Sequence, residues 1–202
     1  VNGFSIESLW IYSVNTSNFP SQLGGDQRGM AAYNGNVYII QRDNTLLEFS
    51  GETGEYLRSI TLTGDCSTDA NGNSLAYKCQ DLFVDAGNHL CVSSMTLDCS
   101  TTPLTVCTID INTGATTRVF NMTCTLGGRI DFTAVRGDVT QTGCEIWAAV
   151  ANSNYVYRWT RNASGYWAIN YTTVSTYYPS GSATTNSTAP RIMPVSNTQF
   201  IL

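Results

Sequence analysis

The chain has 202 residues, 42% of them hydrophobic, so it can bury a substantial core and wholesale disorder is excluded. Only 12% of the residues are charged, and a net charge of −5 with ten Lys and Arg argues against nucleic acid as a partner. No apolar run approaches the roughly 18 residues of a membrane-spanning helix, so we expect no membrane span.

The uncharged residues that are abundant in this chain favour β-structure. Thr, Tyr, Val and Ile suit a pleated, half-buried surface, whereas Asn and Gly suit the turns between strands. Apolar residues at helical spacing do not extend beyond a turn or two anywhere in the chain. We therefore predict an all-β protein.

A first group of strands begins near residue 28. Its four strand-like runs are 28–33, 36–40, 46–49 and 56–62. The first two are separated by Asn34-Gly35, and Asn-Gly between apolar runs is the strongest short signal of a β-hairpin. This order predicts a four-stranded antiparallel meander.

The same order of strands recurs along the chain. A second copy has runs at 80–85, 89–95, 104–110 and 117–122. A third copy has runs at 131–138, 145–150, 155–159 and 167–171. A fourth opens with 191–195 and 199–202. The copies begin near residues 29, 80, 131 and 190, a spacing of roughly 50 residues.

Four strands in each repeat of this length are typical of propeller blades. We predict a single β-propeller domain over 1–202, with about three and a half four-stranded blades and an incomplete ring. The expected blades are 28–64, 79–124, 130–175 and a partial one at 189–202, with a strand at 8–14 belonging to a closing blade. One large β-sandwich, which also needs many short strands, is the alternative.

Three and a half blades are too few to close a ring, since about four is the smallest number known. The chain also ends on the apolar run 200–202. We therefore expect a fragment whose open strand edges are covered by missing blades of the same chain or by other protein subunits.

Several motifs carry a family likeness. The runs 28–31 and 35–40, with Thr53-Gly54-Glu55, resemble the blade signature of secreted propellers of the NHL and YVTN lactonase-like type. The runs 80–95 and 132–138 are similar to the bacterial domain-of-unknown-function family 4623. The likeness covers most of 9–202 and is confined to blade structure. It implies a secreted propeller and transfers no active site.

The seven cysteines all lie between residues 66 and 144. A zinc site is not indicated, because no C-x-x-C occurs and His89 is the only histidine. Disulfides formed in an oxidising compartment are the preferred interpretation, and buried apolar thiols are the alternative. The disulfide candidates are Cys66 with Cys79, Cys124 with Cys144, and two of Cys91, Cys99 and Cys107 on one hairpin. One cysteine is left over.

Five N-x-[ST] sequons are glycosylation candidates: Asn15, Asn121, Asn162, Asn170 and Asn186. In a chain this rich in Asn, Ser and Thr, about four would arise by chance, so the motif gains weight only beside the cysteines and the sparse charge. Asn162 is the best placed, because it falls at a predicted hairpin tip. The chain begins at Val1 without a signal peptide, as a processed secreted protein does.

No residue is assigned as catalytic or as a metal ligand, and no cofactor is expected. Four acids lie near the ends of the predicted inner strands, where propeller channels hold catalytic or metal-binding carboxylates: Asp81, Asp85, Asp131 and Asp138. Each also suits a turn or a strand end. His89 has no Ser or Asp partner in a recognisable motif, so it is interpreted as a strand residue after a turn.

Three further patterns are interpreted as structural. Residues 69–73 alternate oxygen ligands as a calcium loop does, but they lack its later glycine and glutamate, so an Asn-Gly turn is preferred. Arg136-Gly137-Asp138 spells a cell-adhesion tripeptide but stands at the end of a strand. Aromatic residues are dense over 147–178, where blade packing is preferred to a sugar-binding face.

We therefore expect an extracellular or cell-surface, non-enzymatic β-propeller that serves as a structural or interaction module, with protein or glycan partners. The alternative is part of a propeller hydrolase or lactonase-like enzyme with a metal in its central channel. Ions bound by acids from several blades would favour the enzyme, whereas glycans and strand pairing between chains would favour the module.

Overall fold

A computed structural model describes residues 20–24, 26–151, 153, 155–173, 191–196 and 199–201. Within these ranges the chain forms β-strands and one 3-10 turn, η1 (Asp65–Ser67), without an α-helix, and the all-β prediction is confirmed. None of the described residues form a helix long and apolar enough to cross a membrane. The strand predicted at 8–14 lies outside the described residues.

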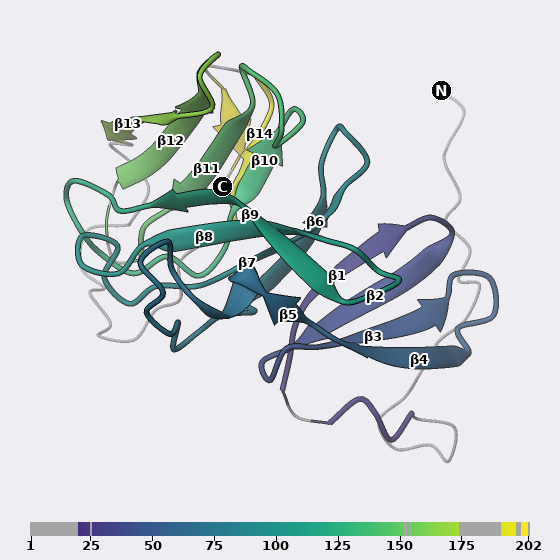
Figure 1. Cartoon of the computed structure of the whole chain (residues 1–202). Coiled ribbons are helices and arrows are strands. Elements are labelled where there is room, and N and C mark those ends of the chain that lie inside the picture. Colours follow the sequence, from purple (N-terminus) through teal and green to yellow (C-terminus); the bar gives the residue numbers. More distant parts are fainter. Residues whose placement is uncertain are drawn as a thin grey trace, which may run out of the picture.

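The first sheet is a meander in which each strand pairs antiparallel with the next (Figure 1). Its strands are β1 (Gln27–Tyr33), β2 (Asn36–Gln41), β3 (Thr45–Ser50) and β4 (Tyr56–Thr61). Asn34 and Gly35 join β1 to β2 with φ of 48° and 81°. Positive φ at both positions matches the right-handed twist of the strands, as the Asn-Gly signal predicted.

The second sheet contains the next predicted meander and one strand more. Its antiparallel strands are β6 (Asp81–Val84), β7 (Leu90–Ser93), β8 (Leu104–Ile109) and β9 (Ala115–Met122). The short β5 (Thr63–Gly64) pairs parallel with β9, so the segment leading out of the first sheet runs along the outer strand of the second. Sequence did not predict β5, because two residues carry no alternation.

The third predicted group of strands also forms one antiparallel sheet. Its strands are β10 (Ala134–Arg136), β11 (Glu145–Ala149), β12 (Tyr155–Arg161) and β13 (Trp167–Thr173). A separate antiparallel pair follows, made of β14 (Met193–Pro194) and β15 (Phe200–Ile201). The described strands thus form successive sheets in chain order, and these sheets do not join into a closed ring.

The second sheet packs on both of its faces. One face meets the first sheet through a core that includes Ile40, Leu46, Leu90 and Cys107. The opposite face meets the third sheet through a core that shares Val106, Phe120, Tyr157 and Trp159, among others. Side chains alternate between the two faces of a strand, so one apolar strand serves both cores.

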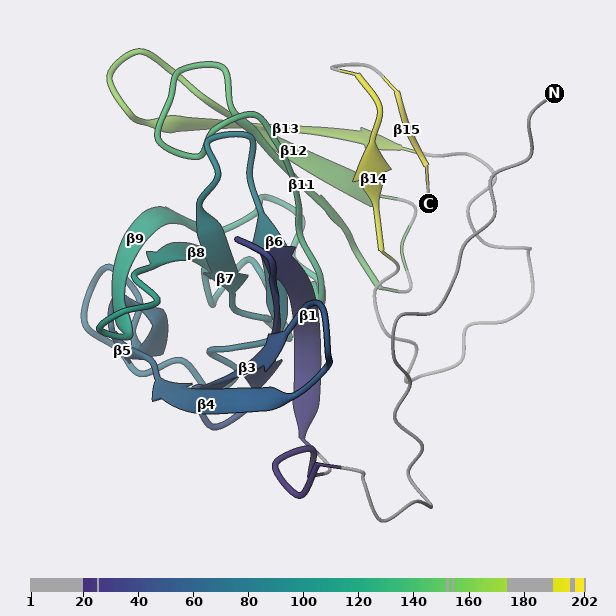
Figure 2. The same cartoon turned by 90° about the vertical axis from the view of Figure 1, so that its right-hand side faces the viewer.

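The first strands of the first two sheets run side by side (Figure 2). Gly29 of β1 lies against the backbone of β6, where a Cβ on Gly29 would stand 2.2 Å from the Leu82 nitrogen. Because that neighbour is backbone and cannot rotate away, the close approach requires glycine.

Candidate functional site

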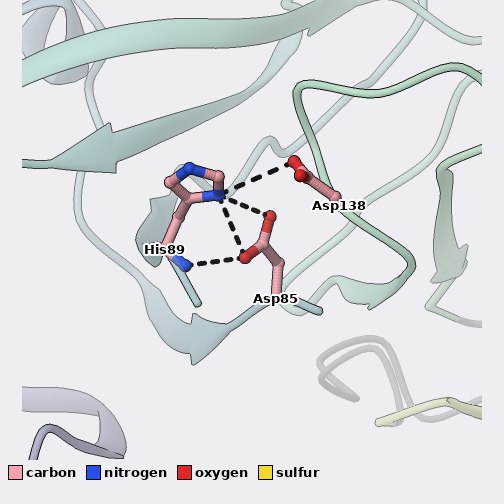
Figure 3. A group of neighbouring side chains, drawn as sticks. All are labelled: Asp85, His89 and Asp138. Carbon is pink, nitrogen blue, oxygen red and sulfur yellow. Dashed lines mark hydrogen bonds and ion pairs between the residues drawn. The ribbon is translucent and has the colours of Figure 1, made fainter. Parts of the chain in front are cut away.

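A cluster of one histidine and two aspartates joins the second sheet to the third (Figure 3). Asp85 and His89 flank the turn between β6 and β7, and Asp138 follows β10. The turn is closed by backbone hydrogen bonds from Asp85 to His89 (3.2 Å) and from Asn88 to Asp85 (3.1 Å). The hairpin therefore places Asp85 and His89 on the same side, four residues apart in sequence.

Asp85 is the centre of the cluster. Its side chain is fully buried, and its two oxygens accept the backbone N–H groups of His89 (2.7 Å) and Val139 (2.8 Å). The His89 Nδ1 lies 3.0 Å from Asp85 Oδ2. A buried carboxylate needs such partners, because an unpaired charge inside the protein is costly.

Asp138 completes the cluster from the third sheet. Its Oδ1 lies 3.7 Å from His89 Nδ1 and accepts hydrogen bonds from the backbone N–H (2.8 Å) and the hydroxyl (2.7 Å) of Thr140. These bonds, followed by the charge of His89, lower the pKa of Asp138. A Cβ on Gly87 would stand 2.5 Å from the Asp138 carboxyl carbon, so a larger residue at position 87 would displace the Asp138 side chain.

The three side chains offer the ligand set of a divalent metal ion. One ligand atom from each lies within 4.8 Å of the others, and His89 Nδ1 is 3.0 and 3.7 Å from the two carboxylate oxygens. Ligands bound tetrahedrally at 2.0–2.2 Å stand roughly 3.4 Å apart, so these separations fit an ion such as zinc. Without an ion, the same groups act as a hydrogen-bonded clamp between two sheets.

The interpretation of His89 as a residue without an acidic partner is wrong. Asp85 lies across the turn and Asp138 comes from a different repeat. A local signal was present, because an aspartate and a histidine at the two ends of a short turn face each other across the hairpin. The Asp138 contact could not be found from sequence, since it depends on how the sheets pack.

Asp81 and Asp131, the other two predicted acids, lie outside this cluster. Asp81 is buried at the start of β6 and binds Arg191, whose guanidinium nitrogen lies 3.1 Å from Asp81 Oδ1. Burial raises the pKa of Asp81, and the charge of Arg191 opposes that rise. Asp131 is buried and accepts a hydrogen bond from Arg129 at 2.8 Å.

The calcium-like loop is an aspartate-centred turn. Asp69 Oδ1 accepts the backbone N–H groups of Asn71 and Asn73, each at 2.8 Å, and Asp69 Oδ2 accepts the Asn73 amide at 2.9 Å. Hydrogen bonds inside the loop therefore occupy the carboxylate that would have bound calcium.

The adhesion-like tripeptide is also structural. Arg136 donates to Glu145 at 3.1 Å, Gly137 has a φ of 100°, and Asp138 belongs to the His89 cluster. Both charged members of the tripeptide are therefore held inside the protein's own contacts, and the preference for a turn agrees with the geometry.

Three of the five sequons fall in the described residues. Asn162 and Asn170 are exposed, the first at the tip between β12 and β13 and the second on β13. Asn121 is half-buried on β9, and its side-chain oxygen accepts the Ala70 N–H at 3.1 Å. Asn15 and Asn186 lie outside the described residues. Among the three described sequons, Asn162 and Asn170 are thus the ones that an oligosaccharide could reach.

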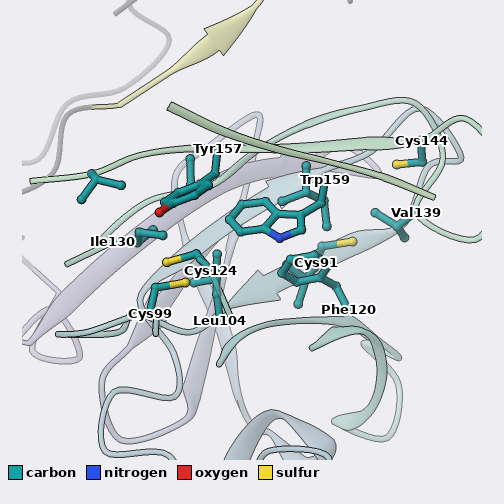
Figure 4. Close-up of a cluster of buried hydrophobic side chains, with 14 residues drawn as sticks. Cys91, Cys99, Leu104, Phe120, Cys124, Ile130, Val139, Cys144, Tyr157 and Trp159 are labelled. Carbon is teal, nitrogen blue, oxygen red and sulfur yellow. The ribbon is translucent and has the colours of Figure 1, made fainter. Parts of the chain in front are cut away.

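All seven cysteines are buried, and no two of their sulfurs are bonded to each other in this structure. Cys66 and Cys79 lie together in the core between the first two sheets, close enough that each thiol shifts the pKa of the other. Cys99 and Cys124 lie together in the core between the second and third sheets, where Figure 4 shows their sulfurs side by side. The structure therefore pairs Cys124 with Cys99, where the sequence favoured Cys144.

Of the remaining three cysteines, Cys91 and Cys144 lie in the core between the second and third sheets, and Cys107 lies in the other core. Cys91 and Cys107 sit on neighbouring strands, but one points into each core. They cannot pair, because the register sets Cys91 opposite Thr108 and Val92 opposite Cys107, an offset of one residue that reverses the face. The expected pairing within this hairpin is therefore not favoured.

Comparison with known proteins gives little further information. No protein-family model matches the chain, and no curated protein matches it. Among solved structures, a europium-containing methanol dehydrogenase is similar over 65% of this chain, with 16% identity and a TM-score of 0.28. The chain spans 25% of the length of that enzyme. A likeness this weak carries no argument about fold or chemistry, so the site is interpreted from its own residues.

Proposed function

We propose that the chain is the blade-forming part of a β-propeller and acts as a non-enzymatic structural or interaction module of a secreted or cell-surface assembly. Its partners are further blades, other protein subunits or glycans. The proposal rests on three features: successive antiparallel sheets, residues that converge from several sheets at one point, and exposed sequons on the outer strand and its turn.

The convergence at Asp81 carries the proposal. Asp81 opens β6, and the backbone N–H of Thr133, which directly precedes β10, is near enough to lower the pKa of its carboxyl against the rise that burial causes. Arg191, which precedes β14, binds the same carboxylate and stacks 4.2 Å above the Phe132 ring. Gly29 of β1 abuts the Asp81 backbone on the other side. Residues in or next to β1, β6, β10 and β14 therefore meet at one point, and such a meeting of four sheets is typical of blades around an axis.

Packing of the middle sheet argues against the alternative sandwich. A two-layer sandwich buries one face of each sheet and leaves the other to solvent. Here the second sheet buries apolar side chains on both faces, one core toward each neighbour. Blades of a propeller bury both faces in this way.

The test uses the chain secreted from a eukaryotic cell line. Sedimentation and a glycan array measure association and sugar binding, and a panel of ester, lactone and glycoside substrates measures hydrolysis with and without divalent cations. The module predicts self-association or glycan binding without turnover of any substrate. Retention inside the cell, or metal-dependent hydrolysis, would contradict it.

The Asp85–His89–Asp138 cluster supports a second candidate, the propeller enzyme with a metal ion in its central channel. Asp85 follows β6 and Asp138 follows β10, so both acids lie at the end of a strand that the proposal places beside the axis. The His89 ring is 36% exposed, which leaves a path for an ion. In this candidate the three side chains hold the ion, and the ion supplies Lewis acidity.

Calorimetric titration with Zn²⁺ or Mn²⁺ decides the second candidate. Binding to the chain should be lost in Asp138→Asn and kept in Asp110→Asn, which removes an exposed carboxylate in another turn. Equal binding by both variants, or no binding to the unmodified chain, would leave the module as the explanation of the cluster.

A further inference from the structure

We infer that the chain carries two disulfide bonds, Cys66–Cys79 and Cys99–Cys124, and that Cys91, Cys107 and Cys144 remain thiols. The connectivity follows from the geometry of the cysteines and is independent of the propeller arrangement. It rests on the proposed function in one respect only, the secretory location that supplies the oxidant.

The first bond closes the long loop between the first two sheets. Cys66 in η1 and Cys79 just before β6 belong to the same buried cluster, and both are at most 2% exposed. Asn44 holds the pair from the first sheet, because its oxygen accepts from Cys79 Sγ at 3.5 Å and its amide donates to Ser67 at 3.1 Å. Ser67 Oγ in turn lies 3.8 Å from Cys66 Sγ, so Asn44 and Ser67 hold the two sulfurs in one small region of the core.

The second bond joins the β7–β8 loop to the segment after β9. The Cys124 backbone N–H donates to the Cys99 carbonyl at 2.8 Å, so the two backbones lie directly side by side. Their side chains point toward each other in Figure 4. A Cα separation fixed by a backbone hydrogen bond is in the range that a disulfide spans.

The other sulfurs point elsewhere. Cys91 Sγ is directed at the His89 carbonyl, 3.6 Å away, and Cys144 Sγ at the Glu145 carbonyl, 4.0 Å away. Cys107 lies in the core of the first bond, on the face of the second sheet opposite Cys91. Burial raises the pKa of Cys107 and of Cys144 to about 12, so neither forms a reactive thiolate near neutral pH.

Each bond forms by two thiol–disulfide exchanges with an oxidant of the glutathione disulfide class, before the core closes. The Cys99 thiolate attacks glutathione disulfide, gives a mixed disulfide and releases one glutathione thiolate. The Cys124 thiolate then attacks the Cys99 sulfur and releases the second glutathione. The protein loses two hydrogens for each bond, and glutathione disulfide is reduced to two thiols.

The test is alkylation of the full secreted chain with N-ethylmaleimide in denaturant, followed by mass spectrometry. Of seven cysteines, three should be alkylated before reduction and all seven after it. Trypsin should release peptides 59–78, 79–118 and 119–129 as one disulfide-linked assembly, while 137–158 is alkylated and linear. Seven adducts before reduction, or a bond between 119–129 and 137–158, would overturn the inference.

Two variants and a refolding experiment distinguish a wrong disulfide connectivity from a wrong cellular location. Cys99→Ser should free Cys124 and give four adducts, whereas the control Cys91→Ser should give two adducts with both bonds intact. Both counts can be read whether or not the variant folds. If the secreted chain is reduced but refolding in a glutathione redox buffer gives the predicted peptides, the connectivity stands and the location is wrong. If that buffer yields other pairs, the connectivity itself is wrong.

Discussion

Removing one oxygen from Asp85 tests how much the histidine cluster contributes to joining the second and third sheets. In Asp85→Asn the side chain keeps its size and its burial, but an NH₂ group replaces one carboxylate oxygen. Both oxygens are in use, since one accepts from His89 and the other from Val139. Whichever way the amide turns, one backbone N–H faces a donor and stays unpaired.

The cost can be estimated from those contacts. Hydrogen bonds to charged groups are worth about 1.5–3 kcal/mol, and an unsatisfied buried donor costs about 1–3 kcal/mol. We therefore expect Asp85→Asn to lower the free energy of unfolding by about 2–3 kcal/mol at pH 7. In urea this corresponds to a fall of about 1 M in the transition midpoint, with little change in slope.

The matched control is Asp138→Asn, in the same cluster. Its carboxylate is 24% exposed, and its Oδ1 accepts two hydrogen bonds from Thr140 that an amide oxygen can also accept. We expect a loss below about 1 kcal/mol. If the two variants unfold at the same urea concentration, the buried carboxylate is not what holds the sheets together, and the clamp interpretation fails.

Three further predictions address other contacts. Gly29→Ala should lower the free energy of unfolding in urea by about 3 kcal/mol, because its Cβ would meet the β6 backbone at 2.2 Å. Gly24→Ala should lower it by under about 1 kcal/mol, because a Cβ there faces open space. Burial would raise the pKa of Glu48, but hydrogen bonds from Arg58, Tyr38 and Asn36 lower it below the ordinary 4.5. The unmodified chain should therefore be more stable than Glu48→Gln above pH 4.5, and this difference in unfolding free energy should vanish on acidification. A difference that grows at low pH would contradict this. Arg191→Ala should lower the free energy of unfolding by about 1–2 kcal/mol at pH 7, a modest loss because Arg191 is 62% exposed. Burial raises the pKa of Asp81, so this loss should shrink at lower pH as Asp81 takes up a proton, and thermal melts measure the change.

The strands and their order could be predicted because their signals are local. The hairpin at Asn34-Gly35 needs positive φ at both residues, and few sequences other than Asn-Gly supply it. The apolar run 104–110 became β8, since its alternating side chains fill the cores on both faces of one sheet. The recurrence of such runs at a fixed spacing was enough to place each sheet.

The partners within the site could not be predicted, because they depend on packing between sheets. Asp138 reaches His89 only when the loop after β10 lies on the β6–β7 turn. Cys124 meets Cys99 because a backbone hydrogen bond sets those segments side by side. The sequence interpretation paired Cys124 with Cys144, a cysteine of the next repeat. Cys144 does face the same core, but its sulfur points at the carbonyl of Glu145.

The parallel pairing of β5 with β9 has a consequence for how the protein aggregates. An outer strand with free backbone groups is a template for pairing with another molecule. On β9, Ala115 and Thr116 are already paired with Thr63 and Gly64 of β5. The segment that leads into the second sheet therefore covers part of the edge strand of that sheet. Fibril growth, if heating or acid starts it, should therefore recruit β4 or β13 before β9, and proteolysis of the fibrils would reveal which strand lies in the protected core.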